Sequence, residues 1–149
     1  MRCVVQRVTN AQVTVEDQVI GRIGHGLVAL IGVEQGDSEK DAQFIADKLG
    51  KLRIFSDEQG KMNLSVRDVG GEIMAISQFT LLGDARGQNR PGFTQAEEPE
   101  RANDLYLYCC QRMQDSGLTV AQGQFRAHMQ VSLNNDGPVT ILLDSRKLF

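Results

Sequence analysis

Several features that carry chemistry in other proteins are scarce in this sequence. Only three of its 149 residues are cysteines, and no C-x-x-C pair occurs, so neither a zinc knuckle nor a thioredoxin-type pair is indicated. We expect Cys3, Cys109 and Cys110 to be reduced, packed thiols. His25 and His128 are the only histidines, and G-x-S-x-G is absent, which argues against a serine–histidine–acid triad and a histidine-rich metal site. We therefore expect neither a metal nor a cofactor.

Long apolar runs are also missing. No stretch approaches the ~20 residues of a membrane span, and residues 1–7 do not resemble a secretory signal. We expect a cytoplasmic protein with no membrane partner. The 16 basic and 19 acidic residues give a net charge of −3, which argues against a protein that coats nucleic acid non-specifically. DNA is not an expected partner.

What remains is ordinary globular composition, with 41% hydrophobic and 23% charged residues. A chain of this length buries enough apolar surface to fold without a metal or a disulfide. No internal repeat and no linker interrupts it. We therefore expect one domain over residues 1–149.

The first part of the chain has the pattern of β-strands. Val13, Val15, Val19 and Ile23 alternate with polar residues or glycine, which predicts a half-buried hairpin turning at residues 16–17. Residues 26–33 form a continuous apolar run, which predicts a buried central strand.

Two later segments have helical periodicity. A helix is predicted after a cap at Asp37 or Ser38, and it ends near Gly50. Its apolar stripe is Ala42, Ile45, Ala46 and Leu49. A second helix is predicted from about Pro99 to Ser116. Its apolar stripe is Ala102, Leu105, Tyr106, Cys109 and Met113.

Further strands are predicted at 52–55, 72–78, 118–120, 128–133 and 139–143, with a loop at 83–95 and a turn at 134–138 that separates the last two strands. Strands interrupted by two helices indicate an α+β fold. We expect antiparallel or mixed β-sheets, barrel-like or two-layer, with two main helices packed on one face.

Residues 21–26 superficially resemble a phosphate-binding glycine loop. Such a loop needs a helix after it, whereas an apolar strand follows here. The preferred interpretation is a hairpin turn that exposes His25.

Three segments carry candidate chemistry. Ser77-Gln78-Phe79-Thr80-Leu81 ends a strand, where active sites are frequent. Residues 136–138 form a turn that ends in Pro138, and Arg86 and Arg90 occupy the long loop, where arginine suits phosphate binding. Taken singly, each segment also has a purely structural interpretation. Residues 77–81 can be an ordinary strand end, residues 136–138 a hairpin turn, and the arginine loop a solvated loop.

Together they are more specific. Residues 77–81 and 135–140 resemble the two signature motifs, SQFTL and NxGPVT, of the D-aminoacyl-tRNA deacylases. The resemblance covers essentially the whole chain and includes the segments Gln6-Arg7-Val8, Arg53-Ile54-Phe55, Lys61-Met62-Asn63 and Met129-Gln130-Val131-Ser132-Leu133. Ala85 and Gly92 depart from the usual arginine loop, which has threonine and serine there.

The resemblance implies a homodimer with its active site at the subunit interface. It implies hydrolysis of the ester between a D-amino acid and the 3′-terminal ribose of tRNA, with rejection of L-aminoacyl esters. The backbone N–H groups of Phe79 and Thr80 would stabilise the oxyanion, and Ser77 and Gln78 would shape the site.

The remaining roles also follow from the resemblance. The Gly137–Pro138 bond is cis in the family and enters the partner subunit's site, where it leaves no room for an L side chain. Arg7 resembles the residue that holds this unit, and Met129 belongs to the substrate-binding set. Arg86 and Arg90 would contact the acceptor end of tRNA. A filter that only rejects L side chains should also admit glycyl-tRNA.

Other functions remain open. A non-catalytic tRNA- or nucleic-acid-binding module would use the arginine loop and bind without turnover. A related deacylase that removes L-alanine would need a trans Gly137–Pro138 bond, and a structural dimer module would need neither motif. Within the deacylase hypothesis, we prefer attack by water assisted by the substrate's own 2′-hydroxyl over attack by Thr80, because no base can be assigned to activate that hydroxyl.

Overall fold

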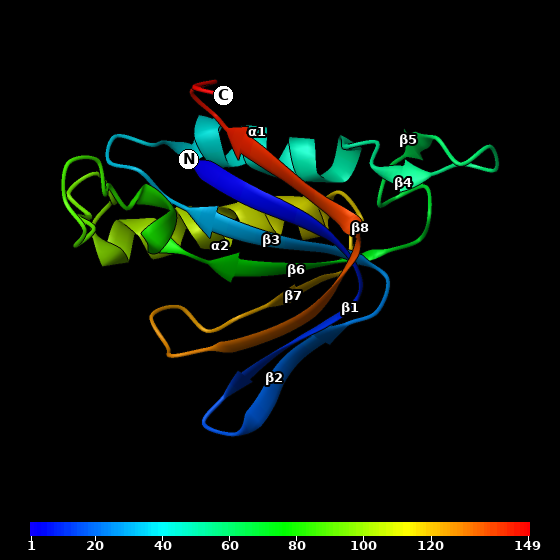
Figure 1. The fold of residues 1–149 in the computed structure, drawn as a ribbon, viewed down its shortest axis with the longest axis horizontal. Helices are drawn as coiled ribbons and strands as arrows, with labels where there is room; N and C mark the ends of the chain where they lie inside the picture. Colours follow the sequence, from blue (N-terminus) through cyan, green and yellow to red (C-terminus); the bar gives the residue numbers. More distant parts are fainter.

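The computed structural model describes all 149 residues, and two long strands organise it. Strand β1 (Arg2–Val15) and strand β8 (Gln130–Asp144) run antiparallel from the pair Arg2 and Asp144 to the pair Thr14 and Gln130 (Figure 1). Because β8 occupies one edge of β1 along both halves, every other partner of β1 lies on the opposite edge.

Two consecutive strands share that opposite edge. Strand β2 (Gln18–Ile23) pairs with the second half of β1, and β3 (Gly26–Gly32) pairs with its first half. The predicted hairpin at residues 16–17 is confirmed, with both residues at positive φ. Residues 21–26 were wrongly predicted as a hairpin turn. Residues 21–23 belong to β2 and Gly26 to β3, and only residues 24–25 bend the chain between them. The two strands therefore lie end to end along β1, which is long enough to pair with both. His25 is exposed, as predicted.

The sheet continues with parallel strands. Strand β6 (Glu72–Ser77) pairs with β3, and β7 (Val120–Gln122) pairs with β6, so the sheet is mixed. Strands β4 (Phe55–Ser56) and β5 (Met62–Leu64) form a separate small hairpin. The predicted strands at 52–55 and 118–120 therefore exist, but each is shifted toward the C-terminus.

Both predicted helices are present. Helix α1 (Glu39–Lys51) starts after Ser38, whose backbone N–H donates to Asp41 Oδ2 at 2.8 Å. Helix α2 (Pro99–Asp115) is capped by Glu98, which accepts from the N–H of Arg101 at 2.8 Å. A short 3₁₀ helix, η1 (Phe79–Leu82), follows β6. Neither α-helix has the length and apolarity that a membrane crossing would need.

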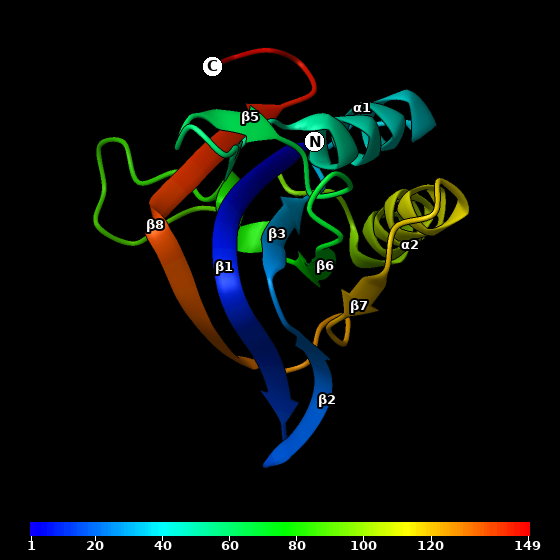
Figure 2. The same cartoon turned by 90° about the vertical axis from the view of Figure 1, so that its right-hand side faces the viewer.

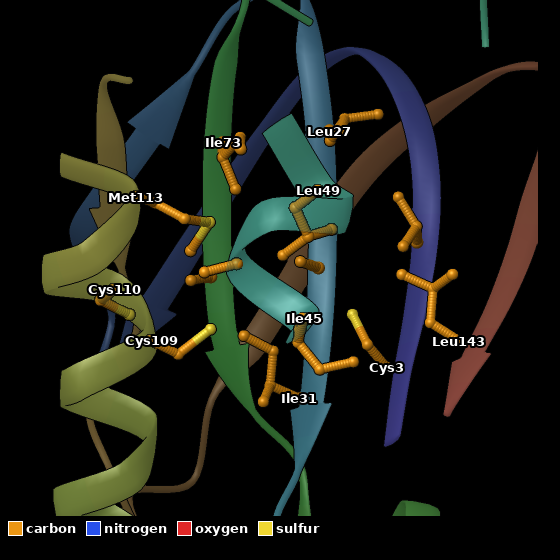
Figure 3. Close-up of a cluster of buried hydrophobic side chains, with 14 of the residues drawn as sticks. Cys3, Leu27, Ile31, Ile45, Leu49, Ile73, Cys109, Cys110, Met113 and Leu143 are labelled. Atoms are coloured by element: carbon orange, nitrogen blue, oxygen red, sulfur yellow. The ribbon is translucent and has the colours of Figure 1, made fainter. Parts of the chain in front are cut away.

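The helices cover one face of a strongly curved, nearly closed sheet (Figure 2). Their apolar stripes pack on β1, β3 and β6 in the main core, where Ile45 and Leu49 of α1 meet Leu27 and Ile73 (Figure 3). A smaller cluster, which includes Val13, lies apart from it. The three cysteines are free and buried, as predicted. The α+β fold with two helices on one face is therefore confirmed.

One predicted turn is wrong. Residues 134–138 do not separate two strands but lie within β8, whose pairing with β1 shifts register there. The side chain of Asn135 accepts from the N–H of Val139 at 2.7 Å and donates to its carbonyl at 3.1 Å. These bonds close a bulge in β8, so the strand continues on both sides of Pro138.

Candidate active site

The first candidate segment, residues 77–81, begins where β6 ends, at the carboxyl end of the parallel strands β3 and β6. Ser77 is opposite Ile31 of β3, and the N–H of Gln78 donates to the carbonyl of Ile31 at 2.7 Å. The chain then enters η1, whose first internal hydrogen bond runs from Leu81 N–H to the carbonyl of Gln78 at 3.3 Å. The N–H groups of Phe79 and Thr80 precede that bond, and the first N–H groups of a helix have no partner inside it.

The side chains of Gln78, Phe79 and Thr80 are held by one hydrogen bond and one ring contact. The amide of Gln78 donates to the hydroxyl oxygen of Thr80. Phe79 is exposed, and its ring meets the ring of Phe93 edge to face, with centroids 5.1 Å apart. An amide nitrogen that donates cannot take a proton, so the contact orients the Thr80 hydroxyl without activating it.

A cavity of about 450 Å³ opens beside the strand end. Ser77, Gln78, Phe79 and Met129 are the predicted site residues that line it, and Thr80 follows directly in the chain. The rest of the lining is Ile31, Val33, Ile76, Ala96, Glu97, Pro99, Ala102, Tyr106, Phe125, Arg126, Ala127, His128 and Val131. The cavity is therefore mostly apolar, with its polar groups concentrated at the end of β6 and on the segment between β7 and β8.

Tyr106 of helix α2 forms part of the buried floor. Its hydroxyl donates to the carbonyl of Ala75 at 2.8 Å. Burial raises the pKa of this hydroxyl well above its ordinary value, so it stays a neutral donor at physiological pH. The bond joins α2 to β6 and fixes the floor relative to the strand end.

The segment between β7 and β8 contributes residues that sequence reasoning missed. Phe125, Arg126 and His128 all line the cavity. His128 was predicted to lie inside a strand, but β8 begins only at Gln130. Nothing in the local pattern indicates these contacts, since they depend on the pairing of β7 with β6, which places the end of β7 beside the end of β6.

The Gly137–Pro138 unit is elsewhere. Both residues are exposed, their peptide bond is cis as the resemblance implies, and neither lines the cavity. Arg7 supports the unit, because its Nε donates to the carbonyl of Asp136 at 2.9 Å and its Nη1 to the carbonyl of Ile54 at 2.6 Å. Within one chain, the structure therefore does not bring the two motifs together.

The arginine loop also lies outside the cavity lining. Arg86 forms an exposed ion pair with Asp84 at 2.7 Å, and this contact lowers the pKa of the Asp84 carboxyl. Arg90 is exposed in the same loop. A bridge between Asp84 and Gly92 closes the loop at its base. Nowhere does the structure gather three histidine, cysteine or acidic side chains that could hold a metal ion.

The chain is a small α+β protein, with a curved mixed sheet under two helices and a polar strand end beside an apolar cavity. The family model described as D-Tyr-tRNA(Tyr) deacylase matches residues 4–144, and this chain belongs to that family. The D-aminoacyl-tRNA deacylase of Anaeromyxobacter dehalogenans (strain 2CP-C) is 58% identical to it over 149 residues, which cover 100% of both chains. That of Thermotoga petrophila (strain ATCC BAA-488 / DSM 13995 / JCM 10881 / RKU-1) is 54% identical over 149 residues, with the same coverage.

Solved structures agree on the fold. A chain described as c-Myc DNA Unwinding Element Binding Protein matches with a TM-score of 0.92 and 39% identity, covering 97% of this chain and 98% of that one. A probable eukaryotic D-amino acid tRNA deacylase matches with a TM-score of 0.81 over 96% of this chain and 98% of that one. At 15% identity, the second match shows a shared fold alone.

Proposed function

We propose that this chain hydrolyses the ester between a D-amino acid and the 3′-terminal ribose of tRNA, releasing free tRNA and the D-amino acid. Membership of the deacylase family supports the reaction class. The observation that carries the proposal is the polar strand end at residues 77–80, which borders an apolar cavity of about 450 Å³. Such a cavity suits a nucleoside, and the strand end suits the polar ester.

Ester hydrolysis develops negative charge on the carbonyl oxygen. The N–H groups of Phe79 and Thr80 open η1 and are suited to stabilise that charge, while Ser77 and Gln78 shape the site around them. One such donor typically contributes ~10²–10³ in rate. Because the donors belong to the backbone at the end of a buried strand, the sheet holds them in place before the substrate binds.

The nucleophile in this proposal is water, assisted by the 2′-hydroxyl of the terminal ribose. The hydroxyl of Thr80 accepts from the amide of Gln78, which is a donor and not a base. A threonine hydroxyl without an adjacent base is a weak nucleophile at neutral pH. Thr80 therefore positions the substrate and does not form an acyl-enzyme.

Chirality is selected by exclusion. A pocket that binds a D side chain also binds an L side chain with only modestly lower affinity, unless a steric clash excludes the L side chain. Gly137 and Pro138 supply that clash from a second copy of the chain, so the active site lies at the interface of a homodimer. Both residues are exposed, neither lines the cavity of its own chain, and Arg7 supports the unit; these three observations favour this arrangement.

The acceptor end of tRNA meets the exposed arginine loop. Arg86 and Arg90 are both exposed and suited to bind phosphates. With a net charge of −3, the chain contacts few phosphates. The logarithm of the binding constant should therefore fall only slowly with the logarithm of the salt concentration, with a slope of ~0.7 per phosphate contact for a single strand.

A second candidate is a nucleic-acid-binding module without catalysis. The observation that favours it is the 39% identical structure, whose description names a DNA-binding protein. The acidic net charge of this chain counts against it. The two candidates differ in turnover, because a binding module retains tRNA and leaves the ester intact.

Deacylation of D-tyrosyl-tRNA beside L-tyrosyl-tRNA tests the proposal, with the wild type and with Pro138→Ala. We expect the wild type to clear only the D ester and the variant to lose activity or selectivity. Binding of tRNA with neither ester cleared would refute catalysis and leave the binding module. Clearance of both esters by the wild type would refute the chiral filter.

A further inference from the structure

The rim of the cavity carries one arginine in an unusual backbone conformation. Arg126 has φ of 65°, in the left-handed region that is sterically unfavourable for residues with a Cβ atom. A turn holds it there, because the N–H of Ala127 donates to the carbonyl of Gln124 at 3.1 Å. Outliers of this kind persist where the surrounding structure imposes them, and they concentrate at functional sites.

The cavity has two distinct parts. Its floor is apolar and buried, with Ile31, Ile76 and Tyr106 each at most 2% exposed. Arg126 and His128 are exposed lining residues and belong to the rim. Both come from the connection between β7 and β8, which lies at the same end of the sheet as the end of β6 (Figure 1). Phe79 and Pro99 are the other exposed lining residues, so the rim that a ligand passes when it leaves the cavity includes Arg126 and His128.

The charge of Arg126 is not neutralised within the chain. None of the eight ion pairs in the structure includes it. Glu97, the one acidic residue in the cavity lining, is instead within 3.5 Å of Arg101. An exposed guanidinium on the rim of an apolar cavity, without a carboxylate partner, suits an anionic group of the ligand.

We infer that Arg126 binds the phosphodiester on the 5′ side of the terminal nucleoside of aminoacyl-tRNA. This inference rests on the proposed function. With the ester at Ser77–Thr80 and the nucleoside on the apolar floor, the next charged group of the substrate is that phosphate, and it leaves at the rim. Guanidinium matches two phosphate oxygens at once, whereas His128 offers one further donor. Arg126 is thus a substrate-binding residue that holds the terminal nucleotide in the cavity.

Arg126→Gly tests the inference, because glycine suits the backbone conformation and removes only the side chain. We expect KM for D-tyrosyl-tRNA to rise about tenfold with kcat unchanged, since a contact made equally in the ground and transition states affects binding alone. Arg126→Lys should restore part of the loss. Arg22→Ala removes an exposed positive charge outside the cavity lining and should leave KM unchanged, which separates a local contact from net charge.

A pair of small substrates locates the contact. The wild type should have a lower KM for 2′(3′)-O-D-tyrosyl-adenosine 5′-monophosphate than for the same ester of adenosine, and Arg126→Gly should abolish that difference. An unchanged KM for D-tyrosyl-tRNA in Arg126→Gly, or an equal loss on both small esters, would overturn the inference while the proposed function stands. Absence of wild-type turnover on D-tyrosyl-tRNA would overturn the proposed function and this inference with it.

Discussion

Arg7 of β1 donates through Nε to the main-chain carbonyl of Asp136 at 2.9 Å, immediately before the Gly137–Pro138 unit. The same guanidinium donates to the carbonyl of Ile54 at 2.6 Å, so one side chain ties the bulge of β8 to the segment before β4. The carboxylate of Asp136 is a weaker partner, 3.7 Å away and 45% exposed. The bond to the backbone, and not the ion pair, therefore fixes the unit.

Substitution of the two partners should have unequal effects. Arg7→Ala leaves two carbonyls without their charged donor, and we expect the free energy of unfolding to fall by about 2–4 kcal/mol. Deacylation of D-tyrosyl-tRNA should fall as well. Asp136→Asn removes only a half-exposed ion pair and keeps the carbonyl, so it should cost about 0–1 kcal/mol. Urea unfolding and deacylation assays on both variants measure this. Equal losses in the two variants would contradict the role of the backbone bond.

Thr80 distinguishes the two nucleophile hypotheses. With water as the nucleophile, Thr80→Ala should keep measurable deacylation, and no acyl-enzyme should accumulate in rapid-quench experiments. Its backbone N–H remains in the variant, which preserves that part of the oxyanion stabilisation. Complete loss in Thr80→Ala, with activity and a trapped acyl-enzyme in Thr80→Ser, would instead make Thr80 the nucleophile.

Local patterns predicted much of this structure. The apolar stripe and cap of α1, the proline at the start of α2 and the alternation around residues 16–17 depend on neighbours in sequence, and all three predictions are confirmed. The motif at 77–81 was predicted at a strand end and lies there.

The errors have a common physical cause. Residues 134–138 have turn composition, but Asn135 closes a bulge and pairing with β1 continues β8 through it. Likewise, most of residues 21–26 belong to β2 and β3, which follow one another along the same edge of β1. The cavity residues Phe125 and His128 depend on the parallel pairing of β7 with β6. Long-range pairing decided each case, and no local pattern encodes it.

Selection by exclusion has a further consequence for glycine. Glycine has no side chain for the Gly137–Pro138 unit to reject, so the wild type should clear glycyl-tRNA as well as D-tyrosyl-tRNA. Time courses with glycyl-, D-tyrosyl- and L-tyrosyl-tRNA at one enzyme concentration measure this. Survival of glycyl-tRNA under conditions that clear D-tyrosyl-tRNA would refute selection by rejection alone and would require positive recognition of the D side chain.

The buried thiols make stability depend on alkaline pH. Burial raises the pKa of Cys110 from its ordinary 9.0 to about 11, and it raises the pKa values of Cys3 and Cys109 as well. Between pH 9 and 11, unfolding therefore releases protons that the folded chain retains. The free energy of unfolding is therefore unaffected by the ionisation of these thiols below pH 9. Above pH 9 it falls as the pH rises, by up to ~1.4 kcal/mol per pH unit for each thiol.

Urea unfolding of the wild type and of Cys110→Ala at pH 8, 9 and 10 isolates this effect. The variant loses packing at every pH, but its free energy of unfolding should fall less steeply between pH 9 and 10 than that of the wild type. Alkaline groups that do not contact Cys110 cancel in the comparison, whereas Cys109 and Tyr106 interact with Cys110, so the difference reports the ionisation of Cys110 together with these neighbours. Tyr106, whose pKa burial also raises from an ordinary 10.0, contributes mainly above this range. Parallel pH profiles for the two proteins would show that Cys110 is not protected from ionisation by burial.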